Sequence, residues 1–128
     1  MNDPAKPPAA LNYIVHMAHA PAWEEAKQTG SYTGDTLHTE GFIHCSQPDQ
    51  LLRVANAPTN PFLGMSDLLL LYLDPTKLQA ALRYEVPPGE QEAYPHLYGP
   101  LNIDAVVKAI LFKPGDDGLY TLPADLSA

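Results

Sequence analysis

Residues 40–46 have the sequence EGFIHCS, which combines the features of a β-strand with three side chains capable of chemistry. Phenylalanine and isoleucine favour an extended backbone, and the glycine before them indicates a turn. Because side chains alternate along a strand, Phe42, His44 and Ser46 should share one face, with the residues between them on the other. A buried imidazole or hydroxyl must be hydrogen-bonded or contact a ligand. The stretch therefore predicts where a binding site lies.

The sequence on either side predicts short strands alternating with short helices. Helices are expected at residues 20–29, 47–55 and 74–78, each with a proline near its first turn. Ser46 is the expected N-cap of the second helix, and Gly30 closes the first. Apolar and β-branched runs predict strands, at residues 11–17, 42–46, 67–73, 83–86, 109–113 and 119–122, with a short strand and loop over 31–39.

Two further stretches are informative. Residues 67–73, DLLLLYL, are almost continuously apolar and predict a central strand covered on both faces. Residues 87–100 contain several prolines and glycines and predict a long loop, and long loops in compact domains are often functional. Residues 103–107 predict a short helix or turn.

With 128 residues, 45% of them hydrophobic, the chain can build one core and is too short for two comfortable domains. Residues 11–122 should form this domain, with residues 1–10 as a disordered lead-in and residues 123–128 as a C-terminal tail. Seven basic against fifteen acidic residues give a net charge of −8, which opposes a broad nucleic-acid or anionic-membrane surface. One cysteine allows no intramolecular disulfide, and no apolar run could cross a bilayer, so a cytoplasmic protein is expected.

Three histidines have distinctive places: His16 in the first strand, His44 in the EGFIHCS strand and His96 in the long loop. Gathered in one cleft, they would bind a ligand or act as general acid and base, since imidazole titrates near neutrality. Taken singly, each is more often a hydrogen-bonded structural residue. Metal sites usually show paired ligands at fixed spacing, and no HxxxH or CxxC pair occurs, so no metal is predicted.

Two other candidates have competing interpretations. Cys45 precedes a helix start, which can stabilise a thiolate, but a cysteine in an apolar strand is more often a small buried hydrophobe. Residues 94–100, YPHLYGP, place two aromatic rings and an imidazole on a backbone stiffened by proline. They suit a slot for a planar ring such as a nucleobase or nicotinamide, and equally a stiff loop whose tyrosines cover the core.

Several motifs occur together in one order along the chain. They are the strand with His16, Trp23 followed by Gly-Ser-Tyr at 30–32, EGFIHCS at 40–46, LYLDP at 71–75, LRYE at 82–85 and PHLYGPL at 95–101. In this series the chain resembles the bacterial domain-of-unknown-function family 952, over about residues 11–122. By fold that family is similar to the ADP-ribosyltransferase-like superfamily, whose members bind NAD in a cleft of a split, mixed sheet.

The resemblance also implies positions for ligand contacts. By the layout of the RNA 2′-phosphotransferase branch, His16 falls in the first NAD-contacting strand and His44 in the second. The third functional position, usually a glutamate, falls near residues 96–101. The chain departs from the pattern there, because no Glu-x-Glu or Gln-x-Glu pair follows. The basic residues with which that branch holds RNA phosphate are also missing, so the fold transfers better than the activity.

We therefore expect a single α+β domain of the ADP-ribosyltransferase-like type, with a mixed, split β-sheet and short helices. It should bind NAD or a related nucleotide, and ADP-ribosyl or phosphoryl transfer is the activity that would follow. The expected catalytic residues are His96 and His44, and the expected cofactor contacts are His16, Trp23, Ser46 and Tyr98. The alternatives are a non-catalytic sensor of a small ligand or partner-binding module and, more weakly, a metal-dependent hydrolase. The oligomeric state stays open.

Overall fold

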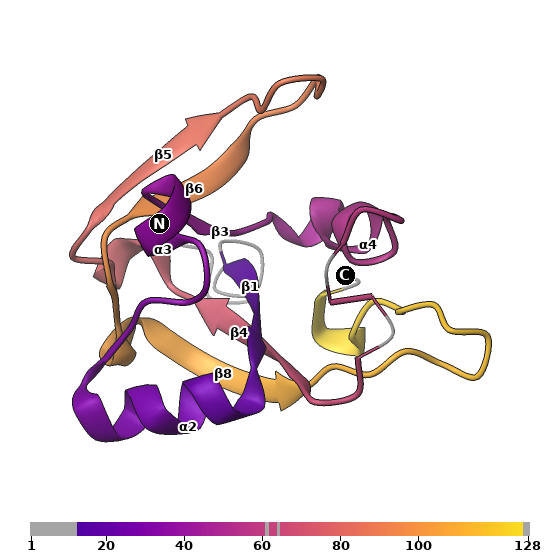
Figure 1. The fold of residues 1–128 in the computed structure, drawn as a ribbon, viewed down its shortest axis with the longest axis horizontal. Helices are drawn as coiled ribbons and strands as arrows, with labels where there is room; N and C mark the ends of the chain where they lie inside the picture. The colour runs from indigo at the N-terminus through magenta and orange to yellow at the C-terminus, as the bar shows by residue number, and fades with distance from the viewer. Residues whose placement is uncertain (1–12, 61, 64, 127–128) are drawn as a thin grey trace, which may run out of the picture.

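The computed structural model describes residues 13–60, 62–63 and 65–126, and strand β4 (Leu68–Leu73) is the centre of the fold (Figure 1). β4 pairs antiparallel with β1 (Ile14–His19) on one side and with β8 (Val106–Leu111) on the other. Successive side chains of β4 enter two different hydrophobic clusters, one on each face of the sheet. The apolar run at 67–73 thus forms a central strand covered on both faces, as predicted.

A second three-stranded sheet has β6 (Tyr94–Tyr98) at its centre, between β3 (Ile43–His44) and β5 (Ala81–Glu85). β5 and β6 form the long hairpin in the upper part of Figure 1. A third sheet has two strands, β2 (Ser31–Tyr32) and β7 (Leu101–Asn102). Every strand pairing within the described residues is antiparallel, so the expectation of a mixed sheet is wrong. Among the described strands, β5 and β6 are the paired strands that follow one another in the chain, and the other pairings join strands far apart in the sequence.

The helices cover the first sheet from both sides. Helix α2 (Ala20–Thr29) ends at Gly30, whose φ of 98° lies in the left-handed region. Its buried residues Trp23 and Ala26 pack into one hydrophobic cluster, as their three-residue spacing predicts. Helix α4 (Leu51–Ala55) packs into the other cluster. The remaining helical turns are short: α3 (Leu37–Glu40), η1 (Pro48–Gln50), η2 (Pro75–Lys77), η3 (Ile103–Ala105) and η4 (Ala124–Leu126).

The long loop expected at residues 87–100 is the main error of the sequence analysis, because residues 94–98 form the central strand β6. Proline is disfavoured in a central strand since it has no N–H to donate. Here the carbonyl of Pro95 accepts the N–H of Cys45 at 3.0 Å, so one half of the backbone pairing is kept. Tyrosines and a histidine alternate with Pro95 and Leu97, which is the period of a strand.

Three smaller expectations also change. Residues 119–122 are not a strand, because Asn56 satisfies the backbone of Tyr120: its Oδ1 accepts the N–H at 2.7 Å and its Nδ2 donates to the carbonyl at 3.1 Å. The stretch after β2 contains helix α3 as well as a loop. The N-cap of η1 is Gln47 and not Ser46, since Gln50 Oε1 accepts the Gln47 N–H at 3.0 Å in a capping box.

The ends of the chain add little to these elements. Residues 1–10, the expected lead-in, lie outside the described residues. In the expected C-terminal tail, Leu126 is buried in the same hydrophobic cluster as α4. Within the described part of the chain, no helix has the length and apolar character needed to span a membrane.

Candidate functional site

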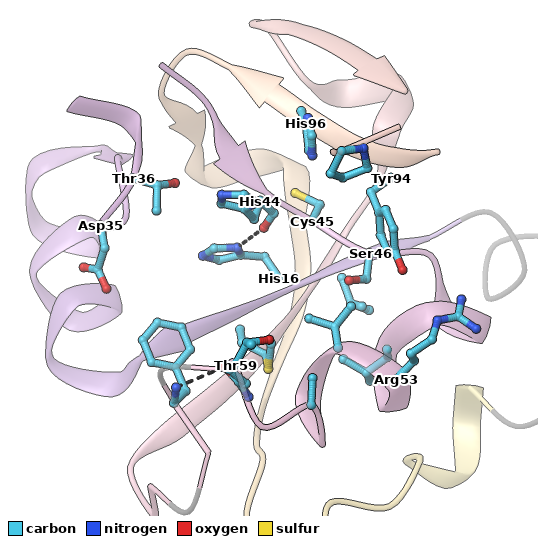
Figure 2. A pocket seen from close by; sticks show the side chains of 18 of the residues that line it. His16, Asp35, Thr36, His44, Cys45, Ser46, Arg53, Thr59, Tyr94 and His96 are labelled. Carbon is cyan, nitrogen blue, oxygen red and sulfur yellow. Dashed lines mark hydrogen bonds between the residues drawn. The ribbon is translucent and has the colours of Figure 1, made fainter. Parts of the chain in front are cut away.

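A cavity of about 520 Å³ lies beside the point where β1 meets the end of β3. Its walls come from these two strands, from α4 and the loop after it, from the loop before α3, and from β6 with the hairpin turn that precedes it. His16, His44 and His96 all line this cavity, and Figure 2 shows His16 and His44 close together between Asp35 and Arg53, with His96 above them. The structure therefore brings together the three histidines that stood out in the sequence.

His16 is held by two hydrogen bonds within the protein. Its Nδ1–H donates to the carbonyl of His44 at 2.6 Å, and its Nε2 accepts from the hydroxyl of Tyr32 at 2.8 Å. Because a carbonyl can only accept, these partners fix the tautomer. Burial lowers the pKa of His16 to about 4 and raises the pKa of Tyr32. At neutral pH the imidazole is uncharged, the phenol keeps its proton, and both ring nitrogens are occupied.

His44 and His96 are direct cross-strand partners on β3 and β6. Their ring centroids are 5.4 Å apart with an edge-on angle of 75°. Phe42 joins them, since its ring stacks on His96 at 4.1 Å and touches His44 edge-on at 4.8 Å. This contact agrees with the predicted strand alternation, in which Phe42 and His44 share a face. The Nε2 of His44 also lies 2.9 Å from Glu40 Oε1, at the half-exposed rim of the cavity.

His96 is the buried member of the pair, with 4% of its surface exposed. Its Nδ1–H donates to Glu85 Oε1 at 2.8 Å, and the same oxygen accepts the hydroxyl of Tyr98 at 2.6 Å. The Tyr98 hydroxyl and then His96 lower the pKa of Glu85, so this carboxylate is ionised at neutral pH. No buried polar side-chain atom among the described residues lacks a partner, and Nε2 of His96 makes no hydrogen bond to them. Nε2 is therefore not fully buried, and His96 lines the cavity.

Ser46 and Cys45 also line the cavity but differ in chemistry. The backbone of Ser46 pairs with Val15, and its hydroxyl makes no hydrogen bond to the described residues and is not fully buried. Cys45 is 4% exposed and belongs to a hydrophobic cluster. Burial raises the pKa of its thiol to about 12, so the thiolate needed by a nucleophile does not form near neutral pH. The structure thus favours a packing role for Cys45.

Two of the expected ring-binding residues lie elsewhere. Trp23 is 6% exposed and packs inside a hydrophobic cluster, where it contacts Tyr32 edge-on. Tyr98 bonds Glu85 and lies beneath the guanidinium of Arg83, 5.3 Å from its ring centroid. Neither lines the cavity. The aromatic rings that do line it include Tyr94 and Phe62.

Several residues that complete the site were not among those predicted from the sequence. Tyr32 and Glu85 orient His16 and His96, and Arg53 brings a cation from α4. The signal for Glu85 was weak, because a glutamate at a strand end is ordinary until the pairing of β5 with β6 is known. Among the described residues no group of three or more His, Cys, Asp and Glu side chains is arranged to hold a metal ion.

The fold is similar to that of solved structures. The crystal structure of protein CC0527 from Caulobacter crescentus is 28% identical, with a TM-score of 0.78, and the match covers 91% of this chain and 99% of that one. A double mutant of CC0527 gives 27% identity and the same TM-score and coverage. Its solution NMR structure gives 28% identity and a TM-score of 0.75, covering 91% and 97% of the two chains.

Among curated proteins none matches the sequence. A family description does match, over residues 17–109, and it is "Protein of unknown function (DUF952)". This range includes His44, His96 and Glu85 together with most of the strands that carry the cavity. Because the match extends over more than half of the chain, the chain belongs to the DUF952 family.

Proposed function

We propose that the cavity binds NAD or a related nucleotide and that the protein is a transferase of the ADP-ribosyltransferase-like type. The volume of about 520 Å³ lies within the range of small-molecule sites, about 300–1,000 Å³. Imidazoles, hydroxyls and aromatic rings converge on it, as a ligand with a ribose and a planar base requires. The resemblance of the sequence motifs to the ADP-ribosyltransferase-like superfamily points to the same ligand class.

The observation that carries this proposal is the pair formed by Glu85 and His96. An ionised carboxylate that accepts Nδ1–H fixes the imidazole and leaves Nε2 with a lone pair. A base placed in this way takes the proton of an acceptor hydroxyl. The oxygen of that hydroxyl then bonds the anomeric carbon of the ADP-ribosyl group, while the bond from this carbon to nicotinamide breaks and nicotinamide leaves. His96 would thereby act as the base in place of the glutamate that the superfamily usually has at this position and that this chain lacks after the PHLYGPL motif.

The other residues would hold the ligand. His44, half-exposed at the rim, and the hydroxyl of Ser46 supply hydrogen bonds to a ribose. His16 contributes indirectly, because its nitrogens are occupied, and it fixes the phenol of Tyr32 so that the phenol oxygen can accept a hydrogen bond from the ligand. With Trp23 and Tyr98 outside the cavity, the ring of the ligand would pack against Tyr94.

The test is thermal unfolding with and without NAD and ADP-ribose, followed by a turnover assay. A ligand at ~100 times its dissociation constant adds about 2.7 kcal/mol to the stability of the protein that binds it. His44→Ala should lose this shift, His96→Ala should keep binding and lose turnover, and the exposed His38→Ala should change neither. The proposal fails if neither NAD nor ADP-ribose stabilises the wild-type protein.

A non-catalytic sensor of a small ligand is the second candidate. It is favoured because two reactive groups at the cavity are not free for catalysis. Both ring nitrogens of His16 are hydrogen-bonded within the protein, and the thiol of Cys45 stays protonated. A sensor would show the thermal shift without turnover. In that case His96→Ala would alter the affinity and there would be no reaction rate to lose.

A further inference from the structure

Arg53 is a cation with an unusual position in this acidic protein. Of the lysines and arginines in the described residues, it alone lines the cavity. Three carboxylates line the same cavity, from Asp35, Glu40 and Glu90. Figure 2 places Arg53 together with Tyr94 on one side of the histidines and Asp35 on the other. Glu90 lies at the same end as Arg53, since its Oε1 accepts the Tyr94 hydroxyl at 3.5 Å, so Arg53 is the one cation that the described lining offers to an anionic ligand group.

In this structure Arg53 is paired with Glu92 of the β5–β6 hairpin. Both side chains are about half exposed, 54% and 44%, so water screens their attraction and the pair adds little to stability. Glu92 has a second partner, since its Oε1 accepts Gln50 Nε2 at 3.0 Å. Gln50 is 3% exposed and also donates to the carbonyl of Ala93 at 2.9 Å. The hairpin thus stays attached to η1 when Arg53 leaves, and Glu92 is not left without a donor.

We infer that Arg53 is the anion-binding residue of the cavity and that it exchanges Glu92 for a phosphate of the ligand. The inference rests on the proposed nucleotide-binding function and specifies which end of the nucleotide lies at α4. A guanidinium presents a planar fork of N–H donors that fits two phosphate oxygens as well as two carboxylate oxygens. Tyr94 lines the same end of the cavity as Arg53 (Figure 2), and its hydroxyl donates to Glu90 Oε1 at 3.5 Å.

The exchange predicts opposite effects for two variants that break the same ion pair. Arg53→Gln removes the cation and should weaken the binding of ADP-ribose by at least about tenfold, equivalent to about 1.4 kcal/mol. Glu92→Gln removes the competing anion, keeps an oxygen for Gln50, and should strengthen binding by about threefold. A purely structural ion pair would instead make the two variants behave alike. Adenosine, which has no phosphate, should bind both variants as it binds the wild-type protein.

The experiment is calorimetric titration of the three proteins with ADP-ribose, adenosine and inorganic phosphate. The inference is supported if the affinity for both phosphate-containing probes is highest in Glu92→Gln, intermediate in the wild-type protein and lowest in Arg53→Gln. Equal binding of ADP-ribose by wild type and Arg53→Gln overturns it and leaves the proposed function in place. If ADP-ribose does not bind but phosphate follows the predicted order, the anion site stands and the nucleotide function falls. Binding of neither probe overturns both.

Discussion

Acidification below about pH 6.5 should destabilise this protein through His16. The pKa of His16 in the folded protein is about 4, below the ordinary value of 6.5, because burial disfavours the charged imidazole. The unfolded chain therefore binds a proton that the folded one does not, as the pH falls below about 6.5. The contribution of His16 to stability is complete above that pH and is lost progressively down to about pH 4, where the folded protein also takes up the proton.

The size of the effect follows from the two pKa values. A separation of about 2.5 units corresponds to about 3 kcal/mol in full, of which about 2 kcal/mol is lost between pH 7 and pH 5. One side of the ring lines the cavity, so solvent screening reduces the expected loss to about 1–2 kcal/mol. The charges that act on His16 are those of Asp35, which raises its pKa, and of His44, which lowers it. Glu85 acts at lower pH, because its pKa is lowered from the ordinary carboxylate range.

The assay is urea unfolding at pH 7, 6 and 5 for the wild-type protein, His16→Gln and His38→Gln. Glutamine keeps a donor and an acceptor but does not titrate, and His38 is an exposed histidine that serves as the matched control. The stability difference between wild type and His16→Gln should shrink by about 1–2 kcal/mol from pH 7 to pH 5, while His38→Gln follows the wild type. Parallel profiles for wild type and His16→Gln, or an NMR titration of His16 centred at 6.5 or above, would refute the reasoning.

Two further predictions concern packing and reactivity. Gly99→Ala should destabilise the protein by about 1–3 kcal/mol, because a Cβ at this position would lie 2.7 Å from the Cβ of Ala80; a midpoint of denaturation equal to that of the wild type would contradict this. The thiol of Cys45 should not react with iodoacetamide at about pH 8 in the folded protein and should react once urea unfolds it, since burial holds its pKa near 12; fast alkylation of the native protein would show that the thiol is accessible.

The parts of the fold that the sequence predicted are those with a local cause. After Asp67, the run at 67–73 consists of leucines and Tyr72. Burial on both faces is therefore its stable arrangement. Helix α2 carries a proline in its first turn and Gly30 at its end, and both act on the backbone within a few residues. The alternation in EGFIHCS placed Ile43 and Cys45 in the core for the same reason.

The errors arise where a distant partner replaces a local rule. Pro95 argues against a central strand unless one knows that Cys45 donates to its carbonyl. The stretch at Tyr120 has strand composition, but the amide of Asn56 takes both of its backbone bonds. Glu85 gains its role only from the register that places β5 beside β6. In each case the deciding contact joins residues many positions apart, which composition and spacing do not encode.

The location of the cavity follows from how the chain passes between its two main sheets. The N–H of Cys45 donates to Pro95 on β6, and the N–H of the next residue, Ser46, donates to Val15 on β1. One residue step thus transfers the backbone from one sheet to the other, and β3 ends after two residues. Side-chain contacts take over where backbone pairing stops, as with the His16 bond to the His44 carbonyl. The imidazoles of His16, His44 and His96 come from the strands on either side of this junction, and all three line the cavity there.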